Sequence, residues 1–168
     1  MRVLTLVLLA VSAVTTAPPS RNGPSLNSSE RQLFERLEGV VASGRPTASE
    51  IVRAFGLPPE CARRSCFFEQ SQVVSHGFTG GDLRPAEDGL VFVLERPTGQ
   101  CIRVDRAIAY FGAGEPRESC SHGGCWYVKA RHRWGILGFG LEAPGATCVA
   151  SVVINSLPYQ RPRDDDAR

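Results

Sequence analysis

The chain has 168 residues, and its 19 lysine or arginine residues nearly balance its 17 aspartate or glutamate residues, giving a net charge of +2. This balance argues against a nucleic-acid-binding protein, because such domains normally carry a strongly basic surface. The length fits a single domain that can bury a hydrophobic core.

The first 17 residues are typical of an export signal. Arg2 supplies a positive charge, residues 3–14 form an apolar run, and small residues follow. The run is too short to span a bilayer, so no transmembrane segment is expected in the mature protein. Cleavage is predicted after Ala13 or Ala17, and residues 18–28 are interpreted as a flexible leader. We therefore expect a periplasmic or secreted protein.

The chain contains six cysteines, an even number that predicts three disulfide bonds in an exported protein. Sequence alone leaves several pairings open. The spacing favours bonds of Cys61 with Cys66, of Cys120 with Cys125, and of Cys101 with Cys148. The last pair closes the longest loop, and in the chain-entropy model its contribution to stability is about 4 kcal/mol.

Helical signals dominate the first part of the domain. Ser29 and Gln32 match a capping box, and apolar residues follow at helical spacing until a glycine stop. A second capping box, Thr47 with Glu50, begins a shorter helix that ends at Gly56. Together the two segments predict a helical hairpin.

From Cys66 onward, apolar residues alternate with polar ones, as is typical of strands. Residues 96–100 predict a tight hairpin loop. The predicted strands are Cys66 to Val74, Gly89 to Glu95, Cys101 to Phe111, Cys125 to Trp134 with a continuation to Leu141, and Cys148 to Asn155.

Helices followed by strands predict an α+β fold, in which an N-terminal helical hairpin packs on an antiparallel sheet of about five strands. This single domain is expected to span residues 29–159. Residues 160–168 are charged and interrupted by proline, and they are interpreted as a disordered tail.

Residues 44–58, GRPTASEIVRAFGLP, combine a glycine, a Ser/Thr cap, an acidic residue, an apolar pair and a Phe-Gly-x-Pro ending. This segment resembles the helix–turn signature of the SmpA/OmlA (BamE-like) and β-lactamase-inhibitor-like proteins of the bacterial envelope. Those families also place two helices before an antiparallel sheet, although the chain lacks the lipidation cysteine of their outer-membrane members. The resemblance implies a protein-binding module rather than an enzyme.

Two alternatives to a binding function, a structural zinc module and a hydrolase, depend on histidine residues. Cys120, His122 and Cys125 have the spacing of zinc ligands, and His132 can complete a tetrahedral set, but a disulfide would remove both thiolates. A small secreted hydrolase would use His122 or His132 with a carboxylate brought near by the fold. Residues 135–141 are rich in glycine but lack the strand–loop–helix context of a nucleotide site. No catalytic residue, metal or cofactor is predicted.

Residues 126–134 alternate more regularly than any other segment. Tyr127, Lys129, Arg131 and Arg133 share one predicted face, while the apolar residues and His132 share the other. The simplest interpretation is a solvated strand face, because such faces are commonly charged. The functional hypothesis is that these four residues bind an acidic surface of another protein. The chain would then be an exported, disulfide-bonded protein-binding module of the bacterial envelope or extracellular space, for example an inhibitor or assembly factor.

Overall fold

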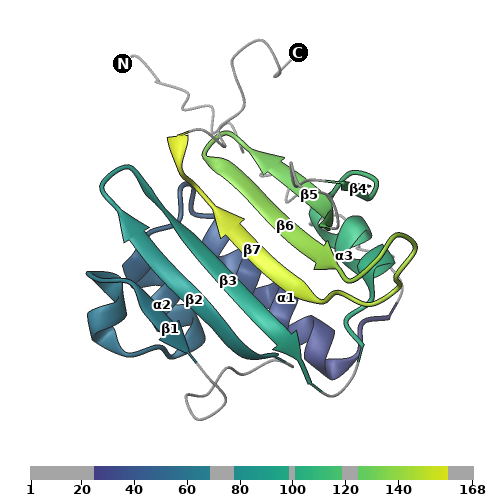
Figure 1. Cartoon of the computed structure of the whole chain (residues 1–168), viewed down its shortest axis with the longest axis horizontal. Coiled ribbons are helices and arrows are strands. Elements are labelled where there is room, and N and C mark those ends of the chain that lie inside the picture. The colour runs from purple at the N-terminus through teal and green to yellow at the C-terminus, as the bar shows by residue number, and fades with distance from the viewer. Residues whose placement is uncertain (1–24, 69–77, 99–100, 119–124, 159–168) are drawn as a thin grey trace, which may run out of the picture.

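A computed structural model of the chain describes residues 25–68, 78–98, 101–118 and 125–158. The predicted signal at residues 1–17, most of the leader and the tail at residues 160–168 lie outside these ranges. Within them, three α-helices lie on one face of a single antiparallel sheet of seven strands (Figure 1). The α+β class is therefore confirmed, whereas the sheet has more strands than predicted. None of the described helices is long and apolar enough to cross a bilayer.

The sheet has the strand order β1-β2-β3-β7-β6-β5-β4, and every neighbouring pair is antiparallel. The last strand in sequence, β7, thus lies at its centre (Figure 1). In chain order the elements are α1 (Ser28–Val41), α2 (Ala48–Phe55), the 3₁₀ helix η1 (Pro59–Ala62), β1 (Cys66–Phe68), β2 (Phe78–Ala86), β3 (Gly89–Pro97), α3 (Val104–Phe111), β4 (Arg117–Glu118), β5 (Trp126–His132), β6 (Gly135–Leu141) and β7 (Ser151–Asn155).

Helix α1 begins at a capping box that differs from the predicted one. The Asn27 side chain accepts a hydrogen bond from the Glu30 amide, and the Glu30 carboxylate accepts one from the Asn27 amide. The predicted box of Ser29 with Gln32 is therefore wrong by two residues. Asparagine caps a helix as well as serine does, and Glu30 supplies the acid three positions later.

Helix α2 follows the prediction closely. Thr47 and Glu50 form the capping box in both directions, and Gly56 ends the helix with φ of 66°. The left-handed backbone conformation at this position favours glycine, because residues with a side chain rarely adopt a positive φ.

The predicted strand from Cys101 to Phe111 is wrong, because most of this segment forms α3. Its apolar residues follow a helical spacing as well as an alternating one, and Ala107 is buried under the sheet. Gly112 ends the helix with φ of 64°. The hairpin loop predicted at residues 96–100 is wrong for the same reason: β3 continues to Pro97, and the next element is a helix.

The single strand predicted from Cys125 to Leu141 is a hairpin of β5 and β6. A two-residue turn, Arg133 and Trp134, reverses the chain, and His132 pairs with Gly135. Gly135 has φ of 151°, and a Cβ atom there would overlap the carbonyl oxygen of Asn155 in β7. Neither Arg133 nor Trp134 is typical of two-residue hairpin turns, so the turn could not be recognised from the sequence.

The remaining strands differ from the prediction mainly in extent. Strand β2 was not predicted, because two glycines and a proline interrupt its alternation. The predicted strand from Cys148 begins later, at Ser151, and Cys148 instead forms an isolated bridge with Arg103. Residues 69–74 of the first predicted strand lie outside the described ranges.

The core lies between the helices and the sheet, with Phe34 of α1 at its centre. The Phe34 ring centroid is 5.2 Å from that of Tyr110 and 5.4 Å from that of Phe111, both in α3, and 6.3 Å from that of Phe139 in β6. These contacts fix both helices against the same face of the sheet. Among the described residues, no helix covers the other face, which we call the open face (Figure 1).

Candidate functional site

Strand β5 places three of the four residues predicted to bind an acidic partner on the open face. Val128 and Ala130 are 0 % and 3 % exposed in the core. Because strand side chains alternate, Tyr127, Lys129 and Arg131 project from the opposite side. These three residues therefore lie together on the open face.

The fourth predicted residue lies outside the strand. Arg133 is exposed in the turn after β5 and is not part of the strand face. The structure instead adds Arg117 of β4, which pairs opposite Tyr127 and is exposed. Strand β4 has only two residues, so no periodic pattern predicted it. We call Arg117, Tyr127, Lys129 and Arg131 the basic patch.

The Tyr127 ring lies over two glycines of the neighbouring strand. Tyr127 pairs with Gly140 and Lys129 pairs with Gly138 in the register of β5 and β6. A Cβ atom at Gly140 would lie 3.0 Å from Cε1 of Tyr127 and would also overlap Oγ of Ser151. At Gly138 the nearest atom, Cδ1 of Tyr127, would be 3.5 Å away, which is an ordinary contact. Gly140 thus provides the space in which the tyrosine ring lies against β6.

A cation lies within reach of this ring. The Nζ atom of Lys129 is 5.9 Å from the Tyr127 ring centroid, within the range of a cation–π interaction. Burial, together with the nearby charge of Arg131, lowers the pKa of Lys129. An anion placed beside Lys129 and Arg131 would relieve this repulsion and favour the charged lysine. The patch therefore combines an aromatic surface with a preference for negative charge.

The open face becomes apolar away from the patch. A row of paired residues runs from Lys129 across Gly138, Val153 and Val93 to Asp82 and ends at Phe67. Asp82 forms an ion pair with Arg84 at 3.1 Å, which offsets its charge. Phe67 is 73 % exposed at the β1 edge. The face thus has a basic end and an apolar middle.

His132 lies at the end of β5, away from the basic patch. Its ring stacks on Trp134 with centroids 4.7 Å apart and an interplanar angle of 8°. Burial lowers the pKa of His132, which keeps the imidazole neutral near pH 7. These contacts describe a packing role. His122 and Cys120, on which the zinc alternative also depends, lie outside the described residues, and the residues inside them contain no group of three potential metal ligands.

Two predicted disulfides are present, joining Cys61 to Cys66 and Cys101 to Cys148. Cys125 is also disulfide-bonded, and its predicted partner Cys120 lies outside the described ranges. None of the described cysteines is a free thiol.

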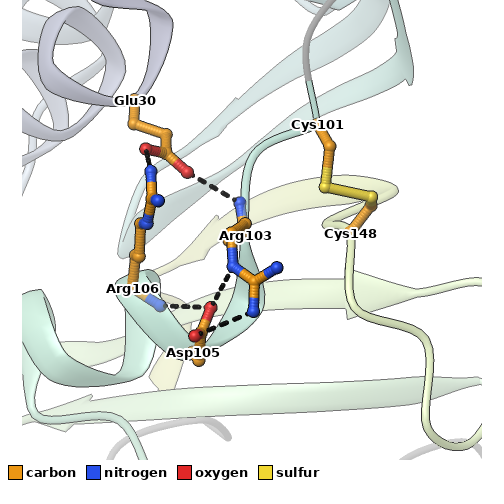
Figure 2. Close-up of a disulfide and its surroundings, with 6 residues drawn as sticks. All are labelled: Glu30, Cys101, Arg103, Asp105, Arg106 and Cys148. Atoms are coloured by element: carbon orange, nitrogen blue, oxygen red, sulfur yellow. Dashed lines mark hydrogen bonds and ion pairs between the residues drawn. A yellow bond between two sulfur atoms is a disulfide. The ribbon is translucent and has the colours of Figure 1, made fainter. Parts of the chain in front are cut away.

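A second polar cluster, missed by the sequence analysis, surrounds the carboxylate of Glu30 (Figure 2). Glu30 is 0 % exposed, yet it accepts hydrogen bonds from the amide of Asn27 at 2.9 Å and from the amide of Arg103 at 3.0 Å. It also forms an ion pair with Arg106 of α3. The cluster therefore ties the beginning of α1 to the beginning of α3. The spacing of Asn27 and Glu30, which matches a capping box, was the available signal.

Hydrogen bonds, most of them from the backbone, determine the charge state of this carboxylate. Burial alone would raise the pKa of Glu30, but the backbone bonds from Arg103 and Asn27 and the interaction with Arg106 outweigh it and lower the pKa. At the surface beside it, Arg103 and Asp105 form two hydrogen bonds of 3.0 Å (Figure 2). All of these groups are satisfied by protein partners, so the Glu30 cluster serves the fold, and the basic patch is the candidate functional site.

Comparison of the chain with protein-family models, curated proteins and solved structures finds no match. The resemblance of residues 44–58 to BamE-like proteins accordingly stays a prediction.

Proposed function

We propose that the protein is an exported, disulfide-bonded binding module of the bacterial envelope or extracellular space, which binds an acidic surface of another protein through the basic patch. It would act by occupying or positioning that partner, as an inhibitor or an assembly factor does. The observation that carries the proposal is the Tyr127 ring, which lies against Gly138 and Gly140, with Nζ of Lys129 5.9 Å from the ring centroid. Arg117 pairs opposite Tyr127 on β4, and Arg131 lies further along the same face of β5.

The composition of the patch supports binding to protein. Tyrosine and arginine are enriched among the residues that dominate binding energy, and a rigid aromatic ring loses little conformational entropy on binding. The position of Tyr127 against β6 restricts its ring before any partner arrives. Positive charges around it would speed association with an acidic surface.

The disulfides support the proposed compartment. Structural disulfides form and persist in secreted and periplasmic proteins, and they are rare in the reducing cytosol. Each of the described cysteines is disulfide-bonded, in agreement with an oxidising compartment. The apolar run at residues 3–14 supplies the route of export in this proposal.

The first test uses Lys129→Ser with Arg131→Ser. The oxidised protein captures its partner from envelope and culture fractions of the native host, and the affinity of the identified partner is then measured directly. The double variant is expected to bind about tenfold more weakly or worse, with a smaller dependence on salt. The fold should persist, because Arg131 is exposed, Lys129 is only half-buried, and surface charges contribute little to stability.

A matched control removes the same charge elsewhere. Arg31→Ser with Arg63→Ser changes two exposed arginines, on α1 and after η1, outside the basic patch. This variant should bind like the unmodified protein. If both double variants lose the same affinity for the partner, the loss is caused by the lower net charge and not by the position of the residues. If the patch variant binds the partner as well as the unmodified protein does, the basic patch is not the contact surface.

A second test leaves the charge unchanged. Gly140→Ala displaces Oγ of Ser151 and shifts the Tyr127 ring by a few tenths of an ångström, whereas Gly138→Ala adds a methyl group at an ordinary contact distance. Gly140→Ala is expected to weaken binding several-fold, while Gly138→Ala should have little effect. If both variants bind normally, the position of the tyrosine ring does not contribute to recognition.

A further inference from the structure

The two described disulfides differ in how well solvent reaches them. Cys61 is 1 % exposed and belongs to the core, and its partner Cys66 is half-buried. Cys101 and Cys148 are both exposed. Thiol–disulfide exchange begins when a thiolate attacks one of the two sulfur atoms, so its rate depends on access to the bond. Accessibility therefore favours exchange at the Cys101–Cys148 bond.

A pocket lies directly beside this bond. It has a volume of about 260 Å³, and Cys148 lines it together with Glu142, Ala146, Thr147, Val149 and Ala150, all on the connection from β6 to β7. Three of these neighbours are alanine or valine, and Glu142 is the only one with a long side chain. A small dithiol fits the space from which Cys148 can be attacked.

The backbone around the bond is held by other interactions. The amide of Val149 donates to the carbonyl of Ile102 at 2.8 Å, and the amide of Val104 donates to the carbonyl of Thr147 at 3.0 Å. The Arg103 amide also donates to the buried carboxylate of Glu30 (Figure 2). These bonds keep the two cysteines adjacent after the sulfur atoms separate, so the pair can close again.

We propose that Cys101–Cys148 is a reversible thiol–disulfide exchange site, which a dithiol reductant opens while the rest of the fold stays intact. One thiolate of the reductant attacks a sulfur atom of the bond and forms a mixed disulfide, releasing the other cysteine as a thiolate. The second thiol of the reductant then displaces the remaining cysteine. Two electrons and two protons pass to the cysteines, and the reductant leaves as a disulfide. The inference is independent of the proposed binding function.

The test follows reduction of the oxidised protein by dithiothreitol over time, with alkylation of the freed thiols and peptide mass mapping. Cys101 and Cys148 should be alkylated about tenfold faster than Cys61 and Cys66, because access limits exchange. The far-ultraviolet circular dichroism should stay unchanged when only this pair is open. After removal of the dithiothreitol, oxidised glutathione should close the pair again.

Opening of Cys61–Cys66 first, or at the same rate, would overturn the proposal. So would loss of circular dichroism in step with reduction of Cys101–Cys148, because the bond would then open only by unfolding.

Substitutions beside the bond test the role of the pocket. Ala146→Trp fills it, whereas Ala143→Trp places the same side chain on an exposed position of the same loop that does not line it. Ala146→Trp should slow reduction about fivefold, and Ala143→Trp should leave the rate unchanged. Equal rates in both variants would show that the reductant does not enter through the pocket.

Discussion

The two capping boxes have the same local geometry and different surroundings. In each box the acid accepts the amide of the N-cap residue, at 2.9 Å for Glu30 and 2.8 Å for Glu50. Glu30 is buried and also binds Arg103 and Arg106 of the α3 region, whereas the contacts of Glu50 are with nearby Thr47 and Ser43. The same motif is thus a local cap in α2 and a tertiary link in α1. How much a capping box contributes to the stability of the fold therefore depends on the burial of its acid and on partners distant in sequence.

The largest expected effect comes from removing the two acids. Glu30→Ala should lower the free energy of unfolding by about 3 kcal/mol, because it leaves Arg106 and the Arg103 amide without their buried partner. Arg106 is partly exposed, which limits the cost. Glu50→Ala should cost at most about 1 kcal/mol, as expected for a local cap. Urea denaturation of both variants measures the difference, and equal losses would mean that burial of Glu30 adds nothing.

The second effect depends on pH. The pKa values of Glu30 and Glu50 are both lowered from the ordinary value of 4.5. A lowered folded-state pKa stabilises the protein above the unfolded-state pKa, and this stabilisation is lost as pH falls through the folded-state value. Stability should therefore decrease from pH 5 toward pH 3, and Glu30→Gln should flatten this decrease more than Glu50→Gln does.

Urea denaturation at each pH provides the measurement. A flatter profile in Glu50→Gln than in Glu30→Gln would reverse the assignment of the buried carboxylate as the more strongly coupled group.

The smallest difference is expected between the two N-cap residues. Asn27→Ala and Thr47→Ala each remove a side chain that accepts the amide of the third helical residue, at 2.8 Å and 3.2 Å. Each substitution should cost about 1 kcal/mol, and the two losses should agree closely. Thermal unfolding compares them directly. A clearly larger loss for Asn27→Ala would indicate that this residue also supports the burial of Glu30.

Local signals decided which helices could be predicted. The glycine and capping signals around α2 lie within a few residues, so the sequence indicated both ends of that helix. The N-cap residue of α3, Arg103, makes no side-chain capping hydrogen bond. The aromatic and β-branched residues of this helix also fit a strand. In α3, packing of Tyr110 and Phe111 against Phe34 overrides that local ambiguity.

The basic patch shows the same limit. Alternation along β5 was enough to place Tyr127, Lys129 and Arg131 on one face. The positions of Arg117 beside Tyr127, and of Gly138 and Gly140 beneath its ring, result from the pairing of β5 with β4 and β6. The register between strands cannot be predicted from the sequence of one strand alone. Arg133 lies in the turn after His132, where the alternation of the strand ends, so alternation did not give its position.

The central position of β7 affects the order of assembly. Its neighbours β3 and β6 belong to two units, β1-β2-β3 and β6-β5-β4. Among the described strands, β7 provides the strand pairing that joins the two units. Hairpins within each unit form between residues close in sequence, whereas β3 and β7 are separated by about 60 residues, and contacts of such long range slow folding. Until β7 inserts, the inner edges of both units remain unpaired and open to strands of other molecules. Substitutions in β7 that delay insertion should therefore lower the yield of soluble protein more than they lower the stability of the folded state.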